Sequence, residues 1–161
     1  MCSKKAVNIK VRKDITKQVK KNLLDFSQLD LLVGVPQEKT EREGNSEPIT
    51  NAELMFIHTN GSPIRNIPKR PTIEPTIEEN KERISEMFKI AVNKVLANKG
   101  DGRADLEKIG LWTVNKIKAK FGSDELAPNA PSTIAHKGDN NPLIDTGQLR
   151  NSITYVIRRK Q

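Results

Sequence analysis

Residues 76–121, TIEENKERISEMFKIAVNKVLANKGDGRADLEKIGLWTVNKIKAKF, decide the fold. The first half of this stretch repeats apolar residues at helical spacing, at Ile77, Ile84, Phe88, Ala91 and Val95. The second half does the same at Leu106, Ile109, Trp112, Ile117 and Phe121. A short Gly100-Asp101-Gly102 connection separates the two halves. The pattern predicts two long amphipathic helices, over about 76–98 and 103–121, that pack as an antiparallel pair.

Short strands are predicted on both sides of this helical pair. Apolar and polar residues alternate at three places, around Val7, Ile9 and Val11, from Leu29 to Val35, and at Ile153, Tyr155 and Ile157. Between the first two places, Asp14 precedes a helical pattern that ends near Phe26. We therefore expect one α+β domain over residues 1–161. In it, a small mixed or antiparallel sheet packs against the two long helices and several short ones.

The remaining segments read as loops and short helices. The charged stretch 37–49 is expected to form an exposed loop, and Thr50 with Glu53 has the spacing of a capping box for a helix over about 51–59. Four prolines within 63–75 predict a stiff, extended segment. A Pro-rich loop follows at 123–142, with one helical turn from Pro131. A last short helix over 147–151 is expected to be capped by Asp145 or Thr146.

Composition indicates a small core and an intracellular site of synthesis. Hydrophobic residues make up 35% and aromatic residues 4% of the 161 residues, so Leu, Ile and Val must fill the core. Such a core is typical of a protein that gains part of its stability in an assembly. Cys2 is the only cysteine, which excludes an internal disulfide. We find no membrane-spanning run and no signal-peptide core, so we expect synthesis and use in the cytoplasm.

The net charge of +8 is concentrated at the two ends of the chain. Residues 1–22 hold eight Lys or Arg and one Asp, and residues 150–161 hold four Lys or Arg and no acid. These basic ends are candidates for contact with DNA in a channel or with an acidic partner. The candidate residues are Lys4, Lys5, Lys10, Arg12, Lys13, Arg158, Arg159 and Lys160. The alternative interpretation is a solvated surface, because no stacking aromatics or Gly-rich loops accompany the charge.

Residues for catalysis or metal binding are sparse. His58 and His136 are the only histidines. Ser152, His136 and Asp145 match a catalytic triad by residue type, but no nucleophile motif supports this set. The sequence has no HxxxH, CxxC or DxDxDG motif for a metal and no Gly-rich phosphate loop. We therefore expect neither an enzyme nor a cofactor.

The segment from Asn141 to Tyr155, NPLIDTGQLRNSITY, is the most informative for function. Asp145 and Thr146 can accept hydrogen bonds from a helix start, and Gly147 permits close backbone approach. A helix cap followed by a core strand accounts for most of this segment. It leaves Arg150 unexplained, and an Arg side chain can engage a carboxylate across a subunit boundary.

Four segments of the chain resemble one family of phage proteins. Residues 142–153, PLIDTGQLRNSI, are similar to the "L-x-D-T-G-x-L-R-x-S" signature of phage tail-completion and virion-morphogenesis proteins, which include neck, head–tail joining and minor tail proteins. Residues 52–61 resemble the "A-x-x-A-x-x-H-E-x-G" segment of that family, 67–72 its "I-P-x-R-P-F" segment, and 131–135 its "L-x-x-S-T-I" segment. The order and spacing agree from 52 to 157. Thr59 and Thr72 depart from the family pattern, where it has Glu and an aromatic residue.

The resemblance implies a structural virion protein of the neck or the head-proximal end of the tail, assembled in the host cytoplasm. Its partners would be further copies of itself, in a hexameric or dodecameric ring, and neighbouring neck, connector or tail-tube proteins. Non-specific contact with DNA in the channel is a further expectation, and membrane contact is not. The residues expected at subunit interfaces are Pro68, Arg70, Pro71, Asp145, Thr146, Gly147 and Arg150. The alternative is a basic DNA-binding virion or phage accessory protein.

Overall fold

The computed structural model describes residues 14–36 and 49–160 of the chain. In chain order, the elements are α1 (Thr16–Ser27), β1 (Leu29–Gly34), α2 (Asn51–Asn60), the 3-10 helix η2 (Pro63–Arg65), α3 (Ile73–Glu79), α4 (Lys81–Leu96), α5 (Arg103–Lys120), α6 (Pro131–Lys137), α7 (Gln148–Ser152) and β2 (Thr154–Arg159). This confirms the α+β class. The predicted strand around Val7–Val11 and nearly all of the predicted loop 37–49 lie outside the described residues.

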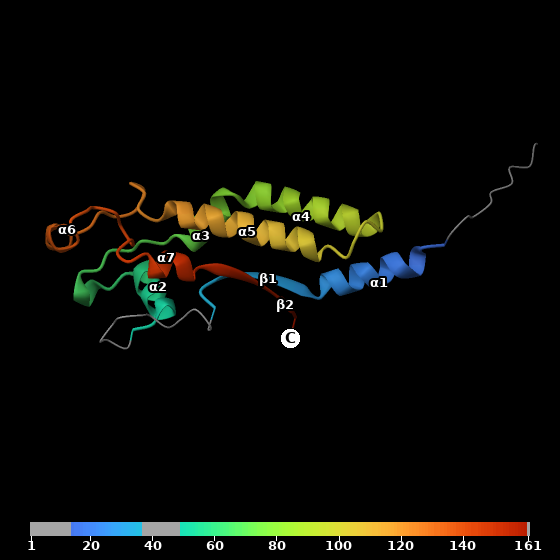
Figure 1. Ribbon diagram of the computed structural model, residues 1–161, viewed down its shortest axis with the longest axis horizontal. Helices are drawn as coiled ribbons and strands as arrows, with labels where there is room; N and C mark the ends of the chain where they lie inside the picture. Colours follow the sequence, from blue (N-terminus) through green and yellow to red (C-terminus); the bar gives the residue numbers. More distant parts are fainter. Residues whose placement is uncertain (1–13, 37–48, 161) are drawn as a thin grey trace, which may run out of the picture.

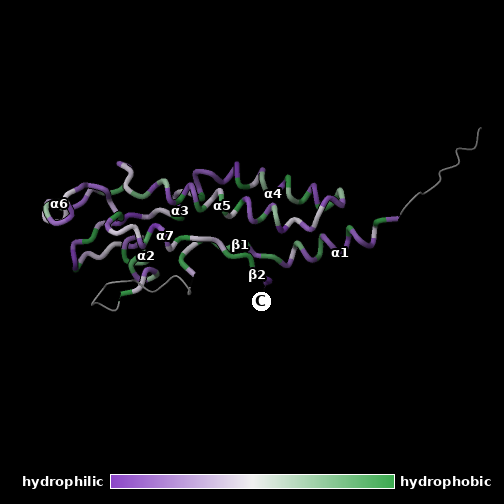
Figure 2. Tube along the Cα trace, viewed as in Figure 1, coloured by the Kyte–Doolittle hydropathy of each residue, from purple (hydrophilic) through white to green (hydrophobic). Residues whose placement is uncertain are grey.

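The molecule is layered around α5. Strands β1 and β2 pair antiparallel, from Leu29 opposite Arg159 to Gly34 opposite Thr154. Helix α5 lies against this sheet, and α4 lies beside α5 on the side away from the strands (Figure 1). Both strands contain hydrophobic stretches, and hydrophobic residues alternate with hydrophilic ones along α4 and α5 (Figure 2). No helix of the described ranges is long and apolar enough to cross a lipid bilayer.

The core confirms the expected reliance on aliphatic side chains. Its central cluster joins α2, α5 and α7 with the residues that directly follow α5 and α7, and consists of Met55, Val114, Ile117, Phe121, Leu149 and Ile153. At the centre of α5, Gly110 faces the sheet, where an added Cβ would lie 2.5 Å from the Tyr155 ring. The helix axis therefore comes close to the strands because this position has no side chain.

The predicted single helix over 76–98 is wrong, since two helices meet at Asn80. The Asn80 backbone has φ −107° and ψ 12°, and its Nδ2 donates to the Thr76 carbonyl at 2.8 Å. A side chain that bonds to the preceding turn competes with regular helix geometry, which accounts for the break. One consequence is that Ile77, predicted to point inward, is 37% exposed.

The prolines of 63–75 also act differently from the prediction. Pro63 begins the 3-10 helix η2 instead of an extended segment. Helix α3 begins already at Ile73 and includes Pro75 in its first turn. Both sites suit proline because the first N–H groups of a helix have no partner within it. Only residues 68–72 lack regular structure, as predicted.

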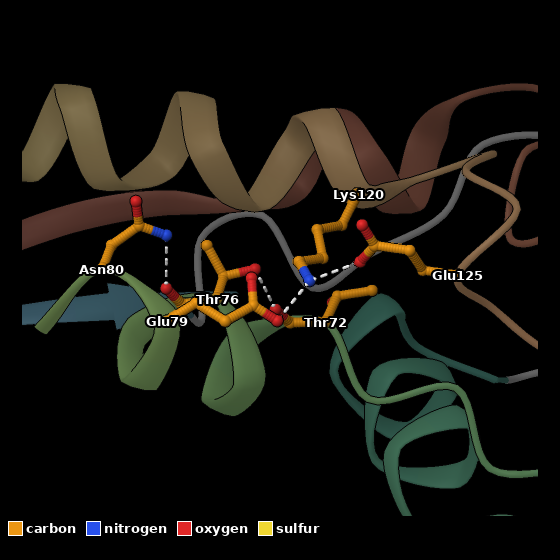
Figure 3. A network of polar contacts seen from close by, with 6 residues as sticks. All are labelled: Thr72, Thr76, Glu79, Asn80, Lys120 and Glu125. Atoms are coloured by element: carbon orange, nitrogen blue, oxygen red, sulfur yellow. Dashed lines mark hydrogen bonds and ion pairs between the residues drawn. The ribbon is translucent and has the colours of Figure 1, made fainter.

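Lys120 links α3 to the end of α5 by an ion pair. Its Nζ lies 2.6 Å from a carboxylate oxygen of Glu79 in α3 and 2.6 Å from one of Glu125 in the following loop (Figure 3). The hydrogen bonds to Glu125 and Glu79 raise the pKa of Lys120. Through these contacts, α3 and the loop after α5 take fixed positions, and the chain on either side of them lines the groove described next.

Candidate functional site

A groove of about 500 Å³ lies where four distant parts of the chain meet. Leu54 and His58 of α2 form one side of it, and the other sides come from the segments 65–70, 129–137 and 143–149. The capping box predicted for α2 is present, with the Thr50 amide donating to Glu53 and the Glu53 amide donating to the Thr50 hydroxyl. Each of the four parts overlaps one of the motif segments noted in the sequence, so the structure brings portions of all four segments to a single site.

Arg70 lies buried at this groove. Its side chain is 7% exposed. Its Nε donates to the Ala127 carbonyl at 2.7 Å, and its Nη2 donates to the Pro128 carbonyl at 2.7 Å and to Oδ1 of Asn129 at 3.4 Å. Arg70 therefore holds residues 127–129 of its own chain in place, and its role at a subunit interface stays a prediction.

His58 is a neutral groove residue at physiological pH. Burial, and to a lesser extent the nearby charge of Arg70, lower its pKa from 6.5 to about 4. Its backbone carbonyl accepts from the Arg70 amide at 2.6 Å, which fixes the two residues side by side. The buried Nδ1 of His58 has no hydrogen-bond partner among the described residues.

Asp145, Thr146 and Gly147 line the groove but do not form the predicted helix cap. Gly147 takes the N-cap position of α7 in the left-handed region, with φ 79°. The Thr146 hydroxyl is 3.5 Å from the Gln148 amide, at the limit of a hydrogen bond, and Asp145 is exposed. The loop is held from the other side by Lys137, whose Nζ donates to the carbonyls of Asn141 and Ile144.

Arg150 lies outside the groove, where the structure gives it a local role. Its Nε donates to the Lys118 carbonyl at 3.1 Å, in the last turn of α5. The last carbonyls of a helix have no partner within it, so this bond caps α5. Pro68 lines the groove and Pro71 does not. The role of these residues at a subunit boundary stays a prediction.

The basic candidates that the structure describes do not line the groove. Arg158 and Arg159 lie on β2, and with Lys160 they are exposed. Arg158 stands opposite Asp30 of β1. Lys4, Lys5, Lys10, Arg12 and Lys13 lie outside the described residues.

The groove does not gather the catalytic set of Ser152, His136 and Asp145, since only Asp145 lines it. Ser152 is buried, and its hydroxyl donates to the Leu149 carbonyl at 2.8 Å. His136 is exposed on α6, and neither Ser152 nor His136 lines the groove. Residues 14–36 and 49–160 contain no group of three or more His, Cys, Asp or Glu placed to hold a metal ion.

The groove also includes Asn129, which the sequence did not indicate as a site residue. Asn129 is 9% exposed, and its Nδ2 has no partner in the described part of the chain, although its Oδ1 accepts from Arg70. The sequence places it only in a Pro-rich loop, because nothing local indicates that Arg70 lies beneath that loop. Comparisons of the chain with protein-family models, curated proteins and solved structures find no match. The interpretation of the groove therefore rests on its own residues.

Proposed function

We propose that this chain is a structural virion protein of a tailed phage, which forms a ring at the neck or the head-proximal end of the tail. The observation that carries the proposal is the convergence of the four motif segments at one groove. The segments resemble those of phage tail-completion proteins, and they are separated by up to about a hundred residues. A shared site gives one physical reason for all four motifs to occur together in one chain.

Exposed apolar side chains support a surface that other subunits cover. Ile64 of η2 is 98% exposed and Phe56 of α2 is 69% exposed. Phe56 borders a second hollow together with Ala52 and Ile57, on the side of α2 away from Leu54 and His58. Contiguous exposed apolar surface is typical of interaction sites. A head-to-tail ring needs two different patches on each subunit, and this surface and the groove are two such patches.

The ring proposal predicts a defined oligomer. The purified chain should sediment as a hexamer or dodecamer, and a phage that lacks the gene should accumulate unjoined heads and tails. The double variant F56D/I64D should abolish the oligomer without unfolding the subunit, because both side chains are exposed. The control L111D places a single aspartate at an exposed leucine of α5 and should leave the oligomer intact. A monomer at high concentration, together with normal plaque formation by the deletion phage, would contradict the proposal.

The second candidate is a DNA-binding virion or accessory protein, favoured by the exposed Arg158, Arg159 and Lys160 at the end of β2. Phosphate contacts by such residues release counterions, so binding should weaken steeply with salt. Replacing all three by glutamine should then reduce the salt dependence by about three ions. Absence of duplex DNA retardation at low salt excludes this candidate.

A further inference from the structure

Arg70 carries a buried positive charge without a counter-charge. All its hydrogen-bond acceptors are neutral oxygens, and no carboxylate of residues 14–36 and 49–160 lies within ion-pair distance of its guanidinium. An Arg side chain stays protonated in proteins even when burial disfavours the charge. A buried charge that has no opposite charge nearby is costly, and an incoming anion would relieve this cost.

One further group of the groove can donate a hydrogen bond to such an anion. The Nδ2 group of Asn129 is a donor without a partner, since Arg70 already occupies Oδ1 of the same amide. The Nδ1 atom of His58 is also unpaired and buried. A cation and an unused amide donor therefore line one groove, and a carboxylate accepts hydrogen bonds from both kinds of group.

We propose that the groove receives an Asp or Glu side chain from a second copy of this chain. The inference rests on the proposed ring and assigns one of its interfaces. A protein carboxylate fits better than a nucleic-acid phosphate for two reasons. Arg70 is only 7% exposed, so only a group at the end of a slender side chain can reach it. The lining also includes the apolar side chains of Leu54, Ile67 and Leu143, which suit a protein segment better than a phosphate backbone.

The chain itself supplies suitable carboxylates. Outside the groove, four exposed acidic side chains have no hydrogen-bond or ion-pair partner within the described ranges: Asp25, Glu74, Glu82 and Asp124. In one copy, none of them pairs with Arg70. A second copy can present one of them, which makes the contact heterologous, as a ring requires.

The variant N129D tests the inference because it places a carboxylate inside the groove, beside Arg70. The internal pair should raise the thermal midpoint of the subunit by about 2–5 °C. The same carboxylate should repel the incoming one and weaken self-association, measured by sedimentation velocity, by about tenfold or more. A residue with a purely structural role would not raise stability and lower association together. The control N115D makes the same charge change on the exposed side of α5 and should alter neither quantity.

Neutral replacements of the four acidic residues provide a second test of the inference. At least one of D25N, E74Q, E82Q and D124N should weaken association about tenfold, and should have no additional effect in the N129D background. If N129D and all four variants associate like wild type, the inference is overturned while the ring stands. A monomeric wild type overturns the ring and the inference together. Loss of duplex DNA retardation in N129D but not in N115D would assign the groove to phosphate and also overturn the inference.

Discussion

Replacing Gly110 with alanine is expected to lower the free energy of unfolding by about 2–3 kcal/mol. The new Cβ would lie 2.5 and 2.6 Å from two carbons of the Tyr155 ring and 3.0 Å from Leu31 Cδ1. Real Cβ atoms do not approach other atoms so closely, so either α5 or the sheet must shift. The ring cannot move away easily, because β2 is held by its pairing with β1.

The sign of the change in the free energy of unfolding distinguishes close packing from helix propensity. Alanine is favoured over glycine in a helix interior by about 1 kcal/mol, so helix propensity alone predicts stabilisation. Denaturant unfolding of G110A should instead show a lower midpoint. The matched control is G34A, because a Cβ at Gly34 meets no heavy atom within 4 Å. A G110A protein as stable as wild type would mean that α5 does not pack closely on the sheet.

The parts of the fold that the sequence predicted are those with local periodicity. The spacing of Leu106, Ile109 and Ile117 predicts a helix without ambiguity, because only a helix places these side chains on one face. The break at Asn80 was missed because its cause is a single side-chain bond to the Thr76 carbonyl, which leaves the apolar spacing almost unchanged. The close approach at Gly110 was missed for a related reason, since the contact joins residues 45 positions apart.

The sequence indicated individual residues of the candidate site but not that they meet at one groove. His58 and Asp145 were both noted as individual residues, and neither their sequence spacing nor their local structure indicates that they line one groove. The sequence does not indicate that Arg70 is buried, because arginine is rarely buried. It is buried here because the carbonyls of Ala127 and Pro128 replace water around the guanidinium, and these residues lie almost sixty positions away in the chain. Packing of distant segments, not local pattern, creates the site.

Acidification is expected to destabilise the subunit through His58. The pKa of His58 is lowered from 6.5 to about 4 in the folded chain, so between these values the unfolded chain binds the additional proton. Stability from this residue is therefore complete above pH 6.5 and is lost as the pH falls toward 4. The full loss amounts to about 3 kcal/mol, large against the stability of a small domain. Denaturant unfolding of the monomeric F56D/I64D protein from pH 7 to 4 would measure it.

The variant H58Q separates this contribution from that of the other titrating groups. Glutamine keeps a polar side chain of similar reach without a charge change, so H58Q should lose most of the dependence between pH 6.5 and 4. The matched control is H136Q, since His136 is exposed on α6 and its replacement should leave the wild-type slope. Equal slopes in H58Q and wild type would place the acid sensitivity elsewhere. In an assembled ring, a carboxylate docked beside Arg70 would favour protonated His58 and raise its pKa, so the oligomer should resist acid better than the isolated subunit.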